Sequence, residues 1–282
     1  MSSEERDLVV RRILVALDAS PHSLAALEAA AELAARLEAE VLGLFVEDVN
    51  LLRLAELPFT QEVCVSTTAR RRLGVREIER DLRAQAARMR RTLEVYAERA
   101  QVRWSFRVTR GVISRELLAA AAEVDLITLG RAGRSFVGER RLGSTARAVL
   151  TEAPCLALVT QHGDHLRLPL MVIYDGSPLA QKALATATAL VQGLDSHIIV
   201  FILAEGGEAA HRAKAQASEW LQKRDLMARF HSLTEASVSR LARMVRMERG
   251  GILVMPAESP LLQGEALLEL LDEVEVPVLL VR

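Results

Sequence analysis

Two stretches of the sequence share one pattern: ILVALDASP at residues 13–21 and LMVIYDGSP at residues 170–178. An apolar run of this length predicts a buried strand. The following serine and proline are typical of a helix start, because serine can cap free backbone N–H groups and proline fits the first helical turn. Each stretch therefore predicts strand, turn and helix, and its second occurrence indicates an internal repeat.

The elements around the two stretches follow one order. After the first, apolar periodicity predicts helices near 24–37, 78–96, 114–123 and 146–152, alternating with strands near 41–46, 102–109, 124–129 and 155–159. After the second, helices near 180–194, 211–226, 238–246 and 261–271 alternate with strands near 198–203, 228–233, 252–255 and 276–281. This alternation predicts an α/β fold, with a parallel sheet and right-handed crossovers in each half. We expect two domains, 1–162 and 167–282, with the boundary in a polar segment.

Residues 47–75 break the pattern, and we predict a long irregular insertion there. The segment has no clear periodicity and carries a proline, a Ser/Thr cluster and three consecutive arginines. Loops of this length are often functional or mobile. Its apolar side chains either dock on a protein partner or cover the chain's own sheet edge or internal interface: Leu51, Leu52, Leu54, Leu57 and Phe59.

Composition narrows the function. The chain has 282 residues, half of them hydrophobic, and a formal net charge of −1, which argues against bulk nucleic-acid binding. No apolar run approaches the roughly 20 residues that span a bilayer, and the N-terminus lacks an apolar signal core, so we expect a cytoplasmic protein without membrane insertion. Cys64 and Cys155 are expected to be free thiols, and His162 and His165 are too few for a metal site.

A glycine-rich segment follows the strand predicted near 124–129. It reads Gly130, two residues, Gly133, nine residues, Gly143-Ser144-Thr145, with arginines at 131, 134, 140 and 141. Glycines let the backbone approach an anion, and a Ser/Thr pair opening a helix offers hydroxyls and free N–H groups. By itself the segment fits a cationic phosphate cradle and a surface loop with solvated arginines equally well.

Taken together, Asp18 after the first strand, the glycine signature and the closing helix and strand with Pro154 resemble the universal stress protein family, here as a tandem. The resemblance implies two Rossmann-like, adenine nucleotide alpha hydrolase-like domains. Each would be a five-stranded parallel sheet with helices on both faces, and the last strands would pack the halves as a pseudo-dimer. It leaves a further homodimer open. In the family's nucleotide-binding branch ATP sits at the carboxyl ends of the strands, where open parallel sheets generally bind ligands.

By position, the resemblance implies a set of nucleotide contacts. Ala16 and Asp18 would border the adenosine, Val46 at the end of the second strand would offer backbone hydrogen bonds to the adenine, and Leu129 and Gly130 would lie by the ribose, with Gly133, Gly143, Ser144 and Thr145 around the phosphates. Alternatively, Asp18 caps the next helix, and Val46 is simply a core residue. The implied ligand is ATP, AMP or ADP with Mg²⁺, for which Asp18 is the one nearby carboxylate.

The second half departs from this signature. Pro256 replaces the first glycine and removes an N–H donor, and Pro256 to Pro277 is 21 positions against 24 from Gly130 to Pro154. Carboxylates stand where the first half has arginines, and they would repel a triphosphate: Glu258, Glu265 and Glu269. Asp175 is expected to cap a helix. The sequence therefore predicts one nucleotide per chain, bound in the first half.

Three functions remain open. The first is an ATP-binding stress-response regulator or adaptor, in which nucleotide occupancy sets conformation or partner choice. The second is a slow ATPase or phosphotransferase, although no residue pair is arranged to activate water and no lysine precedes Ser144. The third is a nucleotide-independent module that regulates a transporter or an enzyme through residues 47–75. ATP pyrophosphatases are set aside, because their Ser-Gly-Gly-x-Asp-Ser loop is absent after the first strand.

Overall fold

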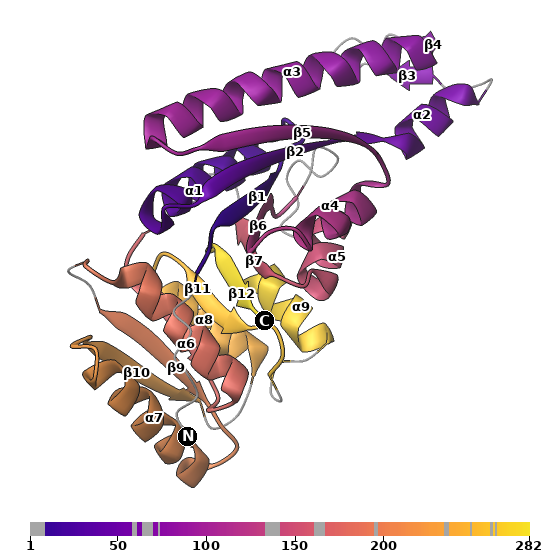
Figure 1. The fold of residues 1–282 in the computed structure, drawn as a ribbon. Coiled ribbons are helices and arrows are strands. Elements are labelled where there is room, and N and C mark those ends of the chain that lie inside the picture. The colour runs from indigo at the N-terminus through magenta and orange to yellow at the C-terminus, as the bar shows by residue number, and fades with distance from the viewer. Residues whose placement is uncertain are drawn as a thin grey trace.

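A computed structural model gives the fold of the chain (Figure 1). It describes residues 9–57, 61–63, 70–72, 74–132, 142–160, 167–194, 197–233, 237–248, 250–259, 262 and 264–282. Within these residues, every helix is too short or too polar to span a bilayer.

One ten-stranded sheet runs through the molecule, in the order β10-β9-β8-β11-β12-β7-β6-β1-β2-β5. The first half contributes β1 (Arg12–Ala16), β2 (Glu40–Asp48), β5 (Trp104–Gly111), β6 (Leu126–Gly130) and β7 (Leu156–Thr160). The second half contributes β8 (Leu170–Tyr174), β9 (Ile198–Leu203), β10 (Ala228–Leu233), β11 (Leu253–Pro256) and β12 (Val278–Val281). Numbered along each half, the strands lie in the order 3-2-1-4-5, which is a Rossmann-like winding.

Helices cover both faces of the sheet. In the first half these are α1 (Pro21–Leu37), α3 (Val75–Ala100), α4 (Ile113–Ala121) and α5 (Ser144–Glu152), and in the second α6 (Pro178–Val191), α7 (Gly207–Gln222), α8 (Val238–Glu248) and α9 (Glu265–Glu273). The buried side chains of α1, α3, α6 and α7 belong to one core cluster, and those of α4, α5, α8 and α9 to the other. The predicted α/β fold class is therefore confirmed.

The two halves join through their last strands. Within each half all neighbouring strands are parallel, whereas β7 and β12 pair antiparallel, with Leu158 opposite Leu279. Each of these strands would otherwise be an apolar sheet edge, and exposed edges invite pairing. The junction makes the chain a pseudo-dimer, as predicted.

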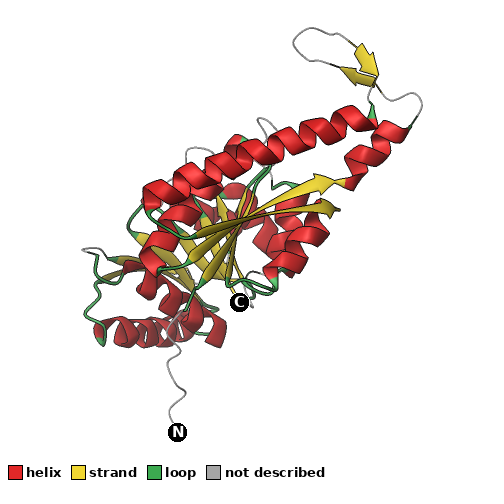
Figure 2. Cartoon of the chain, turned by 45° about the horizontal axis from the view of Figure 1, so that its top comes forward, coloured by secondary structure: helices red, strands yellow, loops and turns green. Residues whose placement is uncertain are grey.

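The insertion at residues 47–75 differs from the prediction of an irregular loop. β2 continues through Val46 to Asp48, so Val46 does not end the strand, and α2 (Val49–Glu56) follows directly. The Asp48 side chain caps α2 by accepting a hydrogen bond of 2.9 Å from the N–H of Asn50. A short hairpin, β3 (Gln61–Val63) with β4 (Arg70–Arg72), comes next, and Figure 2 shows it beyond the sheet at the N-terminal end of α3.

Candidate functional site

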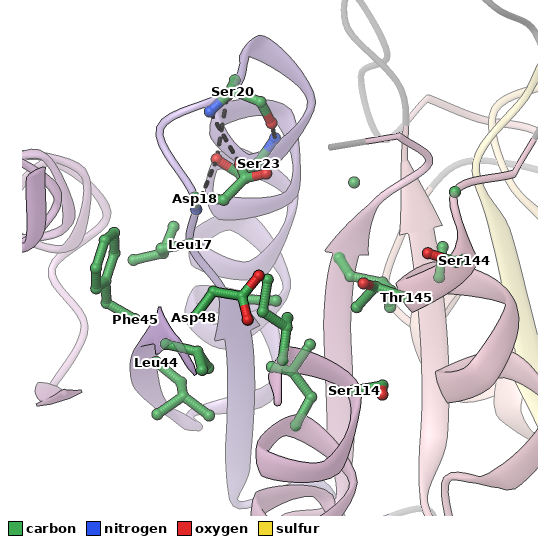
Figure 3. A pocket seen from close by; sticks show the side chains of 18 of the residues that line it. Leu17, Asp18, Ser20, Ser23, Leu44, Phe45, Asp48, Ser114, Ser144 and Thr145 are labelled. Atoms are coloured by element: carbon green, nitrogen blue, oxygen red, sulfur yellow. Dashed lines mark hydrogen bonds between the residues drawn. The ribbon is translucent and has the colours of Figure 1, made fainter. Parts of the chain in front are cut away.

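A cavity of about 720 Å³ lies at the carboxyl ends of β1, β2 and β6 and at the N-terminus of α5 (Figure 3). Of the nine predicted site residues, eight line it: Ala16, Asp18, Val46, Leu129, Gly130, Gly143, Ser144 and Thr145. The ninth, Gly133, lies outside the described residues. Positions spread over 130 residues of sequence thus surround one space, and their role as nucleotide contacts stays a prediction.

The turn between β1 and α1 directs Asp18 to the wall of the cavity. Asp18 Oδ1 accepts a hydrogen bond of 2.9 Å from the N–H of Ser20, and Ser20 Oγ accepts one of 3.1 Å from the N–H of Ser23 (Figure 3). Ser20 is therefore the N-cap of α1, and the alternative of a capping role for Asp18 is wrong. Asp18 instead shapes the turn while its carboxylate remains part of the cavity lining.

Gly130 has a packing reason to be glycine. A Cβ atom there would lie 2.6 Å from His22 Cβ and 2.7 Å from the His22 carbonyl carbon, because the first turn of α1 runs across the end of β6. Both distances are shorter than Cβ contacts in real proteins. The glycine therefore permits close contact between helix and strand, in addition to any contact with a ligand.

The N-terminus of α5 points into the cavity. Gly143 is its N-cap, and Ser144 and Thr145 are the first two helical residues. A glycine offers no side-chain acceptor, so the structure assigns this helix start no side-chain cap among the described residues. The first N–H groups of a helix, together with its dipole, favour an anion at this position.

Arg131 differs from the prediction of an arginine facing phosphates. Arg131 is 5% exposed and is part of the cavity lining, but its guanidinium is bound to the other half of the chain. Nη1 donates a hydrogen bond of 2.9 Å to the carbonyl oxygen of Val274, and Nη2 donates to that of Leu271, both at the end of α9. The other arginines of the predicted cradle, at 134, 140 and 141, lie outside the described residues.

Sequence reasoning missed a group of cavity residues from the insertion and from α3 and α4: Asp48, Asn50, Leu51, Leu82, Gln85 and Ser114. A signal for the first of them exists, because an aspartate directly before a leucine-rich run is a helix-start pattern. Figure 3 shows the Asp48 carboxylate at the pocket wall. The cavity therefore carries two carboxylates, Asp18 and Asp48, on the side opposite α5.

In the second half, the carboxylate that corresponds to Asp18 is bound by other groups of the protein. Ser259 is fully buried, and its Oγ donates a hydrogen bond of 2.7 Å to Asp175 Oδ2. Asp175 Oδ1 accepts one of 2.9 Å from the N–H of Ser177, which caps α6 itself, so the expectation that Asp175 caps this helix is wrong. Both carboxylate oxygens of Asp175 are thus engaged inside the protein.

The described residues contain no cluster of three or more histidine, cysteine, aspartate or glutamate side chains that would hold a metal ion. Cys155 is a free thiol immediately before β7, and Cys64 lies outside the described residues. Burial raises the pKa of the Cys155 thiol to about 11. A protonated thiol is a poor nucleophile and a poor metal ligand.

The winding of the sheet and the cavity at its carboxyl edge define an α/β protein of the Rossmann-like class. The chain belongs to the universal stress protein family, whose family model matches residues 10–161. No curated protein matches the chain.

Two solved structures that match nearly the whole chain share its fold. A universal stress protein from Archaeoglobus fulgidus DSM 4304 is 15% identical, with 95% of each chain covered and a TM-score of 0.75. A functionally unknown protein from Pseudomonas aeruginosa PAO1 is also 15% identical, with 97% of this chain and 92% of the other covered and a TM-score of 0.61. A universal stress protein in complex with cAMP is 20% identical over 55% of this chain and 99% of its own, with a TM-score of 0.40.

Proposed function

We propose that the chain binds one adenine nucleotide in the cavity of its first half and acts as a nucleotide-dependent regulator or adaptor of a cytoplasmic stress response. The single observation that carries the proposal is the convergence of eight sequence-selected residues on one cavity, at the edge of the sheet where α/β proteins bind ligands. The proposal treats residues 1–162 and 167–282 as two domains of one fold, of which only the first binds.

The cavity suits a ligand with two chemically different ends. We assign the phosphates to the N-terminus of α5, where Ser144 and Thr145 lie, and the adenosine to the side of Val46 and Asp18. Mg²⁺ fits as a companion of the phosphates. Because Asp18 and Asp48 each have one oxygen already bound to a backbone N–H, phosphate oxygens and water would supply most of the Mg²⁺ ligands.

α2 offers a route from the nucleotide to a protein partner. Its first turn lines the cavity through Asn50 and Leu51, while Leu54 and Leu57, in and just after its last turn, are 50% and 56% exposed. A nucleotide that touches the first turn would change how the helix presents these leucines to a partner with an apolar surface. Limited proteolysis tests this step: ATP should slow cleavage within residues 47–75, and an unchanged cleavage rate in the ATP-bound chain would rule it out.

Calorimetric titration with ATP, ADP and AMP in the presence of Mg²⁺ tests the function. We expect saturable binding with about one site per chain, lost in Gly143→Leu because a bulky side chain would enter the cavity at the start of α5. No binding at millimolar nucleotide would overturn the proposal. Phosphate release that exceeds release by Gly143→Leu would show that binding is followed by hydrolysis.

A further inference from the structure

The last turn of α9 binds the first end of the loop between β6 and α5, residues 131–143, although the two lie in different halves of the chain. Arg131 leaves β6 and places its guanidinium on the carbonyl oxygens of Leu271 and Val274. The last carbonyl groups of a helix lack intrahelical partners and form the negative end of its dipole. A planar guanidinium with several donors therefore suits this position, and Arg131 acts as a cap for α9 supplied by the other half.

The backbone of Arg131 is fixed as firmly as its side chain. Its N–H donates a hydrogen bond of 2.7 Å to the carbonyl oxygen of Thr160, and its own carbonyl oxygen accepts one of 2.9 Å from the N–H of Gly143. Gly143 is the N-cap of α5. A single residue thus connects the end of α9 to the start of the helix that faces the cavity.

Asp272 holds the second end of the same loop. Its Oδ1 accepts a hydrogen bond of 2.8 Å from the N–H of Leu142, and its Oδ2 lies 3.9 Å from Arg147 Nη2 on α5. The residues that the last turn of α9 contacts, 131 and 142, therefore bracket the whole loop. A shift of α9 would move both ends together with the N-terminus of α5.

We infer that α9 of the second half is the positioning element of the nucleotide site, with Arg131 and Asp272 as its positioning residues. The inference rests on the proposed function and deepens it, because it gives the second half, to which no nucleotide is assigned, a role in the pocket of the first. Nucleotide affinity then depends on the position of α9 relative to the loop. By thermodynamic reciprocity, bound nucleotide also tightens the junction between the halves.

The first test is nucleotide affinity in Arg131→Met and Asp272→Ala. We expect the Kd for ATP to rise about tenfold in each, within the usual range of coupling between sites. Asp272→Asn keeps an acceptor oxygen for the N–H of Leu142 and should rescue most of this loss. Arg282→Ala is the matched control, because Arg282 Nη2 also donates across the junction, to the carbonyl oxygen of Leu150 near the C-terminal end of α5, without touching the loop at its N-terminal end. Its Kd should match that of the wild type.

The second test needs no nucleotide. The N–H of Gly143 donates to the carbonyl oxygen of Arg131 and not to α9. Its hydrogen-exchange rate therefore reports how firmly the two ends of the loop are held together. In chains shown to be folded by their thermal unfolding, Asp272→Ala should speed this exchange at least severalfold, and Arg282→Ala should leave it unchanged.

The two tests separate the inference from the proposed function. If the wild-type chain binds no nucleotide, the proposed function fails, while exchange at Gly143 still decides whether α9 positions the loop. Unchanged exchange in folded Asp272→Ala overturns the positioning role. Changed exchange with an unchanged Kd overturns the coupling to nucleotide.

Discussion

Ser259 Oγ lies 2.7 Å from Asp175 Oδ2 and donates a hydrogen bond to it. The carboxylate of the second half is therefore already bound to a buried hydroxyl. The equivalent carboxylate of the first half, that of Asp18, lines an open cavity. The two halves share a strand order and a turn pattern and differ at this contact. The difference supports a single nucleotide site.

Replacing Ser259 tests whether this contact is structural. Ser259→Ala should lower the free energy of unfolding by about 1–3 kcal/mol, because it removes a buried donor from the partly buried Asp175 carboxylate. Urea unfolding measures the loss. ATP affinity and a stoichiometry of about one should stay unchanged, because the contact lies outside the first-half cavity. A second equivalent of bound ATP in Ser259→Ala would contradict the assignment of a single site.

Ser20 and Ser177 form a matched pair of helix caps. Each hydroxyl accepts a hydrogen bond of 3.1 Å from an N–H in the first turn of its helix, so alanine at either position should cost about 1 kcal/mol in urea unfolding. Only Ser20 lines the cavity. Ser20→Ala should therefore weaken ATP binding by roughly twofold to tenfold, the loss of about one polar contact. Ser177→Ala should leave it unchanged, and equal affinity losses in both variants would point to stability alone.

Gly130→Ala tests the contact between β6 and α1. The added Cβ would meet His22 backbone atoms at 2.7 and 2.9 Å, so α1 must shift, and we expect a loss of about 1–3 kcal/mol in the free energy of unfolding. Gly207→Ala is the control, since a Cβ there meets nothing within 4 Å. Urea titrations of both variants decide the matter. Equal stabilities would show that the space at Gly130 is less restricted than the structure indicates.

The regular elements could be predicted from sequence because buried parallel strands are continuous apolar runs. β8 and β9, for example, are buried at every position. The repeated Asp-x-Ser-Pro turn identified the start of each half, and the glycine signature located the cavity. Because the connections between most strands and helices are short, local signals of this kind predict most of the elements of the fold.

Two features could not be predicted because their causes lie far away in the chain. The partners of Arg131 are 140 and 143 residues distant, so nothing near it in sequence separates a phosphate ligand from a helix cap. Likewise, nothing near Gly130 in sequence indicates that an added Cβ there would meet His22 on α1. α2 differs for another reason: at eight residues, it is shorter than the stretch in which helical periodicity can be recognised.

Cys155 should react slowly at neutral pH. Burial raises its pKa from 9.0 to about 11, so at pH 8 the folded chain holds about a hundredfold fewer thiolates than the unfolded chain, and the thiolate is the reactive form. In a Cys64→Ser background, alkylation by iodoacetamide at pH 8 should therefore be about a hundredfold slower than in urea.

The pH dependence of the alkylation rate separates this cause from simple shielding. Because the folded-state pKa is raised, folding favours the protonated thiol. Its contribution to stability is fully present below the unfolded pKa, near 9, and is lost as the pH rises toward 11. The rate should thus climb between about pH 9 and 11, and Cys155→Ala should remove the matching fall in the free energy of unfolding. A slow rate that levels off near pH 9 would show that access to the thiol, and not its pKa, limits the reaction.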